Sequence, residues 1–158
     1  MRHVLSVLVE NKSGVLSRVI GLISRRGFNI ESLSVGPTED ETLSRITVIV
    51  QADTAAYDQI TKQLHKLVSV HKIYDLSGGD AIESQLILYK VASTPETRPQ
   101  LVQLANNYHA RIVNATPQTL TLEVCGSEAQ LSGLEVLLRD YGLKEVIRSG
   151  KIAMARKE

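Results

Sequence analysis

The residues best suited to binding chemistry form a polar elbow, Glu10-Asn11-Lys12-Ser13-Gly14, between an apolar strand and an amphipathic helix. Free N–H groups at the start of a helix carry partial positive charge and favour a carboxylate. An asparagine at the start of the next strand offers a donor and an acceptor. We interpret this corner as a site for a small zwitterion, with the helix N-terminus beside that amide. The candidate residues are Asn11, Gly14, Val15, Leu16, Asn29 and Ile30.

A purely structural role fits the same residues. Ser13 or Asn11 can cap the helix, and Gly14 can ease the turn that precedes it. Asn29 can simply begin a strand. Gly27 is expected to end the helix, as glycine often does. Considered alone, these residues leave both interpretations open.

Hydrophobic periodicity predicts the elements of the first half of the chain. Apolar residues on both sides of the strand at 3–9 predict an interior strand, or one covered by a partner. The later elements are a helix from about residue 15, a hairpin of strands at 28–35 and 43–51, a helix capped by Asp53, and a strand at 71–76. The order strand–helix–strand–strand–helix–strand is that of a ferredoxin-like domain.

The second half repeats this order after a polar break, Ser77-Gly78-Gly79-Asp80, which we expect to be flexible. The predicted elements are a strand at 84–92, a helix opened by residues 94–97, a hairpin of strands at 111–115 and 119–125, a helix with a Ser127/Gln130 capping box and a strand at 143–147. We therefore predict an α+β protein of two ferredoxin-like βαββαβ domains, at 1–76 and 84–158, joined by a linker at 77–83.

Composition narrows the possible functions. The net charge is +1, with acids and bases mixed along the chain, which argues against a nucleic-acid partner. No apolar run approaches the length of a membrane span, and a single cysteine fits a reducing compartment, so a cytoplasmic protein is expected. Cys125 lies in an apolar alternating run and is interpreted as a buried structural thiol.

Catalytic and metal chemistry find little support in the sequence. The four histidines, His3, His65, His71 and His109, show no metal-ligand spacing, and Asp75 with Asp80 is a weak cation candidate. No phosphate loop or nucleophile set is visible. We expect no catalytic residue, no metal and no cofactor in this chain.

Three exposed segments admit further interpretations. The arginines of the first helix, Arg18, Arg25 and Arg26, form either a solvated face or a docking surface. The acidic turn at residues 39–41 is expected to be solvated, and the basic C-terminal tail to be frayed.

Residues 5–50 closely resemble the ACT domain of acetohydroxyacid synthase regulatory (small) subunits, and the match continues through residues 63–68. The segments that carry the resemblance are Asn11, Ser13-Gly14, Leu16-Ser17-Arg18, Gly27, Asn29 to Leu33 and Leu43-Ser44-Arg45. The second domain resembles the family more loosely, and the length and two-domain layout agree.

The resemblance implies a non-catalytic partner of a large subunit that uses thiamine diphosphate, Mg and FAD to make the first intermediates of branched-chain amino acids. It implies activation of that subunit and feedback inhibition by valine or another branched-chain amino acid. It also implies homodimers joined through ACT domains, with the effector at their interface. The alternative is a stand-alone amino-acid-sensing module acting on another metabolic or transcriptional partner. A ferredoxin-like RNA binder is disfavoured because stacking aromatics are scarce.

Overall fold

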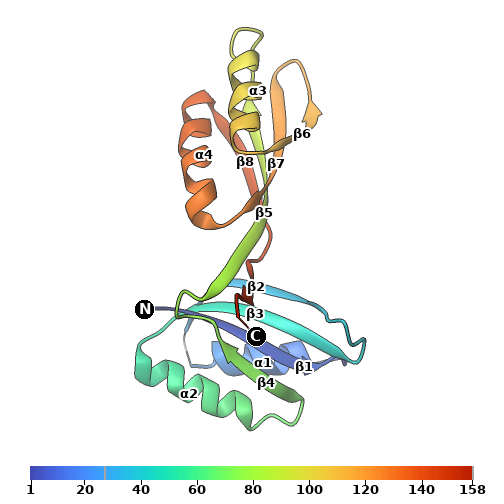
Figure 1. The fold of residues 1–158 in the computed structure, drawn as a ribbon, viewed down its shortest axis with the longest axis vertical. Coiled ribbons are helices and arrows are strands. Elements are labelled where there is room, and N and C mark those ends of the chain that lie inside the picture. The colour runs from blue at the N-terminus through green and yellow to red at the C-terminus, as the bar shows by residue number, and fades with distance from the viewer. Residues whose placement is uncertain (27, 158) are drawn as a thin grey trace. The chain divides into compact units, whose positions relative to one another are not determined.

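The computed structural model describes residues 1–26 and 28–157 (Figure 1). The chain divides into two compact units. The first contains Met1–Ile82 together with the C-terminal stretch from Lys151 onward, and the second is Glu83–Gly150. This division differs from the predicted 84–158 domain, because the last residues belong to the first unit.

The first unit is a four-stranded antiparallel sheet with two helices, in the strand order β2-β3-β1-β4. Its elements are β1 (Arg2–Glu10), α1 (Val15–Ser24), β2 (Asn29–Pro37), β3 (Leu43–Gln51), α2 (Thr54–His65) and β4 (Val70–Asp75). β1 is an interior strand, as its apolar residues on both faces predicted.

Alternation along β1 and β3 builds the main core of this unit. Leu5, Val7 and Val9 face the helices together with the β3 residues Val48 and Val50. Both helices cover this face with residues at helical spacing, which are Val15, Val19, Ile23, Tyr57, Ile60 and Leu64. Apolar residues repeat every two positions in the strands and about every 3.6 positions in the helices, so each element has one apolar face. These faces pack together to give the α+β architecture.

The two helices begin differently. The Asp53 carboxylate accepts a hydrogen bond of 2.8 Å from the Ala56 N–H, which confirms the predicted cap of α2. At α1 the N-cap is Gly14, and no side chain caps the helix, so the expected caps from Ser13 or Asn11 are wrong. The expected stop at Gly27 lies outside the described residues, and α1 ends at Ser24 with Arg25 as C-cap.

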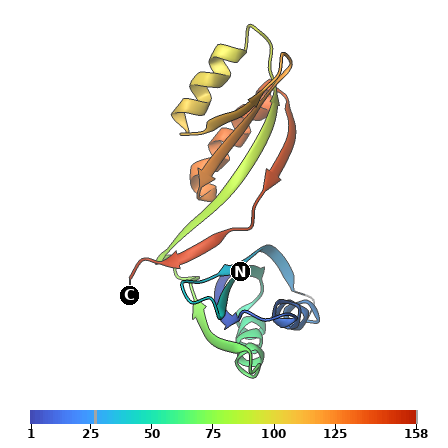
Figure 2. The same cartoon turned by 90° about the vertical axis from the view of Figure 1, so that its right-hand side faces the viewer.

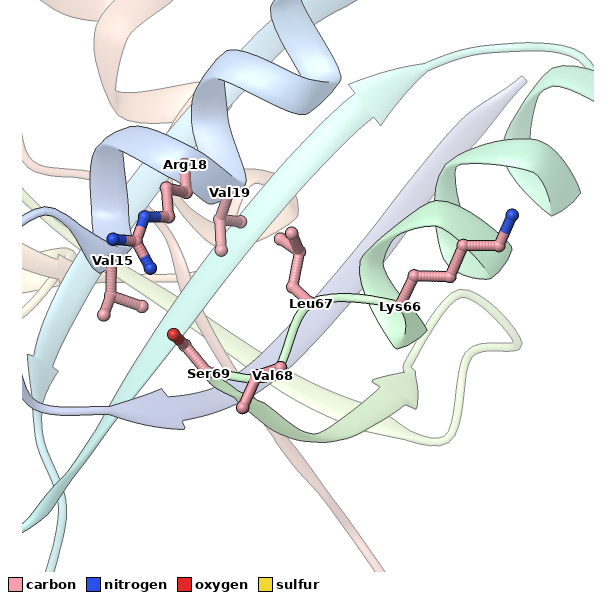
Figure 3. A pocket seen from close by; sticks show the side chains of 7 residues that line it. All are labelled: Val15, Arg18, Val19, Lys66, Leu67, Val68 and Ser69. Carbon is pink, nitrogen blue, oxygen red and sulfur yellow. The ribbon is translucent and has the colours of Figure 1, made fainter.

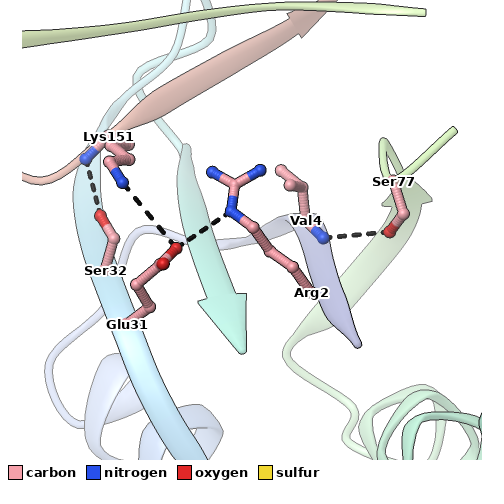
Figure 4. Close-up of polar contacts among 6 residues, drawn as sticks. All are labelled: Arg2, Val4, Glu31, Ser32, Ser77 and Lys151. Atoms are coloured by element: carbon pink, nitrogen blue, oxygen red, sulfur yellow. Dashed lines mark hydrogen bonds and ion pairs between the residues drawn. The ribbon is translucent and has the colours of Figure 1, made fainter. Parts of the chain in front are cut away.

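The C-terminal tail forms an additional strand, β9 (Ile152–Ala155), which pairs with β5 (Ala81–Ala92). Ala153 packs with Val4 and Ile49 on the sheet face opposite the helices. The Lys151 N–H donates to Ser32 Oγ at 2.7 Å, and its ammonium lies 3.8 Å from the Glu31 carboxylate (Figure 4). The expectation of a frayed tail is therefore wrong for residues 151–155.

The polar break also begins with an ordered turn. Ser77 Oγ accepts a hydrogen bond of 3.0 Å from the Val4 N–H (Figure 4) and donates one of 2.5 Å to Asp75. Burial works against ionisation of Asp75, but the hydrogen bonds from Ser77 lower the pKa of its carboxyl. Ser77 is thus fixed to β1 and β4, contrary to the expected flexibility at this residue.

The second unit repeats the plan, with the strand order β6-β7-β5-β8. Its further elements are α3 (Arg98–Asn107), β6 (Arg111–Ala115), β7 (Thr119–Gly126), α4 (Glu128–Tyr141) and β8 (Leu143–Arg148). The yellow α3 and orange α4 cover one face of the sheet (Figure 2). The predicted Ser127/Gln130 capping box is present, and Gly142 ends α4 with φ 102°.

Cys125 is exposed, so its interpretation as a buried thiol is wrong. On β7 the side chains of Leu120, Leu122 and Val124 are buried against the helices. Successive side chains of a strand point to opposite faces, and Cys125 therefore faces away from this core.

Candidate binding sites in the first unit

Asn11 fastens the elbow to the tip of the β2–β3 hairpin. Its backbone N–H donates to the Thr42 carbonyl at 2.8 Å, and its side-chain amide donates to the Glu41 carbonyl at 3.1 Å. Hydrogen bonds from Thr42 lower the pKa of the exposed Asp40 and complete the turn. One donor of the Asn11 amide is thus used within the chain, while the side chain remains exposed.

Gly14 begins α1 in a backbone conformation that favours glycine. Its φ is 84°, in the left-handed region, and a Cβ placed there would meet no atom within 4 Å. Glycine is therefore required by the backbone rather than by crowding within the chain. No side chain caps α1; the N–H of the buried Val15 donates to the Lys12 carbonyl at 3.4 Å, and the exposed Leu16 follows in the same turn.

Asn29 lies far from this elbow. It is paired with Gln51 of β3, and Gln51 is paired with Arg2 at the start of β1. The elbow follows the other end of β1, where Glu10 is paired with Leu43. The eight residue steps from Leu43 to Gln51 correspond to about 26 Å along the strand. The expected position of the helix N-terminus beside Asn29 in one chain is therefore wrong.

The direction of the strands explains this separation. β1 and β2 are both antiparallel to β3, so they run parallel to each other. A crossover helix between parallel strands starts at the end of one and returns the chain to the start of the next. α1 therefore places the elbow and Asn29 at opposite ends of the sheet.

The three apolar candidates do not form one pocket either. Val15 is only 4% exposed and belongs to the core, whereas Leu16 is 37% exposed on the outside of α1. Ile30 packs against the core at the end of the sheet that holds Asn29. Within one chain, the six predicted residues thus fall into an elbow group and a β2 group.

A pocket of about 270 Å³ lies between the first half of α1 and the segment that follows α2 (Figure 3). Its lining residues are Val15, Arg18, Val19, Lys66, Leu67, Val68 and Ser69. Sequence analysis noted Arg18 as a docking candidate but not the pocket. The helix capped by Asp53 was predicted to bear Val68 on its apolar face, but α2 ends at His65 and Val68 is 93% exposed.

Metal-ligating geometry is absent from residues 1–26 and 28–157, where no group of three histidine, cysteine or acidic side chains is suitably placed. The His3 ring stacks on Tyr57 with centroids 3.9 Å apart and is buried. Asp75 is engaged by Ser77, as described above, so the weak cation candidate gains no support. None of the helices in these residues is both long and apolar enough to cross a membrane.

Family models match both halves of the chain. Residues 5–72 match a model described as an AHAS small subunit-like ACT domain. Residues 84–157 match one described as the small subunit of acetolactate synthase. The two matches together span most of both units.

Whole-length relatives agree with these models. A probable acetolactate synthase small subunit of Archaeoglobus fulgidus is 46% identical over 99% of this chain and 98% of its own. The acetolactate synthase small subunit of Haemophilus influenzae is 45% identical over 100% of this chain and 98% of its own. The crystal structure of the Thermotoga maritima small subunit superposes with a TM-score of 0.89 at 32% identity, covering 100% of this chain and 99% of that one.

Proposed function

Because this chain belongs to the acetolactate synthase small subunit family, we propose that it regulates the catalytic subunit of that enzyme. In this role it binds the large subunit, raises its activity and confers feedback inhibition by valine or another branched-chain amino acid. The chain itself takes no cofactor and contributes no catalytic residue. The thiamine diphosphate, Mg and FAD chemistry belongs to the cytoplasmic partner.

The observation that carries the proposal is the uncapped start of α1 at Gly14. The N-terminus of a helix carries about half a positive charge, which attracts the carboxylate of an amino acid. Gly14 adds no side chain to block that approach, and the nearby Ser13 and Leu16 are exposed. An amino-acid effector would also need a partner for its ammonium, and the one carboxylate of the elbow, Glu10, already lies 3.5 Å from Lys12 and 3.8 Å from His71.

A second copy of the chain would supply such a partner. β2 is an edge strand, so its outer backbone groups are free to pair with another strand. Antiparallel pairing of β2 with its copy brings the start of one strand to the end of the other. Asn29 and Ile30 of one subunit would then approach the elbow of the other, at two equivalent sites related by a two-fold axis.

Such an interface would couple effector binding to the arrangement of the dimer. A ligand bound between two subunits stabilises the arrangement in which both halves of its site meet. A coupling free energy of about 1–3 kcal/mol would change the affinity of the chain for its catalytic partner about 5- to 150-fold. An effector that bound both arrangements equally would not regulate.

Two experiments together test the proposal. Calorimetric titration with L-valine, compared with L-leucine and L-isoleucine, should show saturable binding. Co-purification with the thiamine-diphosphate large subunit, followed by activity assays, should show activation and inhibition by the same amino acid. Valine binding without association with the large subunit would instead favour the stand-alone sensor. If the chain neither bound a branched-chain amino acid nor associated with the large subunit, the regulatory function would be refuted.

A further inference from the structure

The pocket between α1 and the segment after α2 differs in character from the elbow. Val15, Val19 and Leu67 form an apolar floor, and the almost fully exposed Val68 extends this surface at the rim (Figure 3). A single exposed valine on a protein surface is common, but Val68 adjoins a pocket whose floor is also apolar. The combined surface suits an apolar group of modest size.

Positive charge surrounds this apolar surface. Arg18 lies on the α1 side, and Lys66 follows α2 with its ammonium extended away from the pocket (Figure 3). Neither residue forms an ion pair with any residue that the structure describes. Residues 15–26 contain three arginines and no acid, and residues 54–66 contain two lysines and one aspartate. The helical face of this unit is therefore basic.

The chemistry of the lining residues disfavours a free amino acid as the occupant. None of the seven residues is acidic, so an ammonium group would enter without a carboxylate partner. An apolar side chain with acidic neighbours fits both the floor and the charged surroundings.

We propose that this pocket docks one aliphatic or aromatic side chain from an acidic segment of the catalytic subunit. The inference rests on the proposed regulatory function and assigns a surface to it. The apolar side chain would fill the hollow beside Val68, and the flanking carboxylates would pair with Arg18 and Lys66. The effector elbow adjoins this pocket at Val15 but opens on the exposed Gly14 and Leu16 at the start of α1.

The test measures association of the full-length chain with its purified catalytic subunit. Val68→Asp places a carboxylate at the apolar rim, and Arg18→Glu reverses a charge at an exposed position. Each variant should raise the Kd for the catalytic subunit at least tenfold. The affinity of the unaltered complex should fall as ionic strength rises, less steeply for Arg18→Glu. Valine binding by the isolated chain should remain unchanged in both variants.

Matched controls separate this surface from general effects of charge. Val136→Asp alters another exposed valine, on α4, and Lys144→Glu reverses another exposed charge. Both should associate like the unaltered chain. Equal association for all four variants would overturn the pocket while leaving the regulatory function standing. Loss of valine binding in Val68→Asp, with association intact, would also overturn it. Failure of the unaltered chain to associate would refute the regulatory function itself.

Discussion

The backbone N–H of Lys151 donates a hydrogen bond of 2.7 Å to Ser32 Oγ, joining residues 119 positions apart. This bond starts the segment that places Ala153 against Val4 and Ile49 on the helix-free face of the first sheet. The first unit is therefore completed by the last residues of the chain. The segment is held by a contact of very high sequence separation, and the entropic cost of closing a loop grows only slowly with its length.

We predict that Ala153→Asp destabilises the protein. Ala153 is 8% exposed among apolar residues, and a carboxylate there would lose hydration without gaining a partner. The free energy of unfolding should fall by about 2–4 kcal/mol. Urea denaturation followed by circular dichroism measures this change.

Met154 provides a control on the same strand, because its side chain is 71% exposed. Met154→Asp adds the same charge on the opposite face of β9 and should change the stability by no more than about 0.5 kcal/mol. Equal stability of the two variants would mean that β9 does not pack on this sheet in solution.

The strands and helices of both units could be predicted because each has a clear period. The β-branched run at Leu43–Gln51 is β3 with the predicted bounds. β9 was missed because four residues in a basic tail carry too little periodicity. Its one signal in the sequence was Val4, an apolar residue on the face of β1 away from the helices. Val4 indicated that a further segment covers this face, but not which segment.

The candidate site was harder to predict than the fold. The expectation that Gly14 eases the turn before the helix agrees with its φ of 84°. Asn29 lies close to the elbow in sequence but at the opposite end of the sheet, so closeness in sequence does not predict a shared corner. The parallel connection from β1 to β2 predicts this separation, because the helix between two parallel strands must span the length of the sheet.

We predict a loss of stability at alkaline pH that depends on Tyr89. This residue is 1% exposed, and its hydroxyl donates to Glu135 at 3.3 Å. Burial, followed by the charge of Glu135, raises the pKa of Tyr89 to about 12, compared with 10.0 for the free side chain. Between these pH values the unfolded chain loses a proton that the folded chain keeps, so stability falls as pH rises. The shift corresponds to about 2–3 kcal/mol.

Tyr89→Phe removes this titration. Its free energy of unfolding should fall less steeply than that of the unaltered protein as pH rises from about 10 to about 12. Tyr57, whose pKa burial also raises, is present in both proteins and cancels in the comparison. Parallel pH profiles for the two proteins would contradict the raised pKa of Tyr89.

We predict that Gly14→Asp abolishes valine binding by placing a carboxylate where the effector carboxylate should lie. Because φ is 84°, any side chain at this position adds backbone strain of about 1–2 kcal/mol. Gly14→Ala shares that strain without the charge and should weaken binding less. Calorimetric titration with valine measures both. Equal binding by Gly14→Asp and the unaltered protein would remove the elbow from the effector site.

The separation of Asn29 from the elbow makes a stronger prediction about mixed dimers. Gly14→Asp and Asn29→His homodimers should each lose or weaken both effector sites. If each site combines the elbow of one subunit with Asn29 of the other, a dimer of the two variants has one doubly altered site and one intact site. Differently tagged chains, co-expressed and purified through both tags, should therefore bind one valine per dimer with the affinity of the unaltered protein. A mixed dimer with two impaired sites and no intact one would show that each site is built within a single chain.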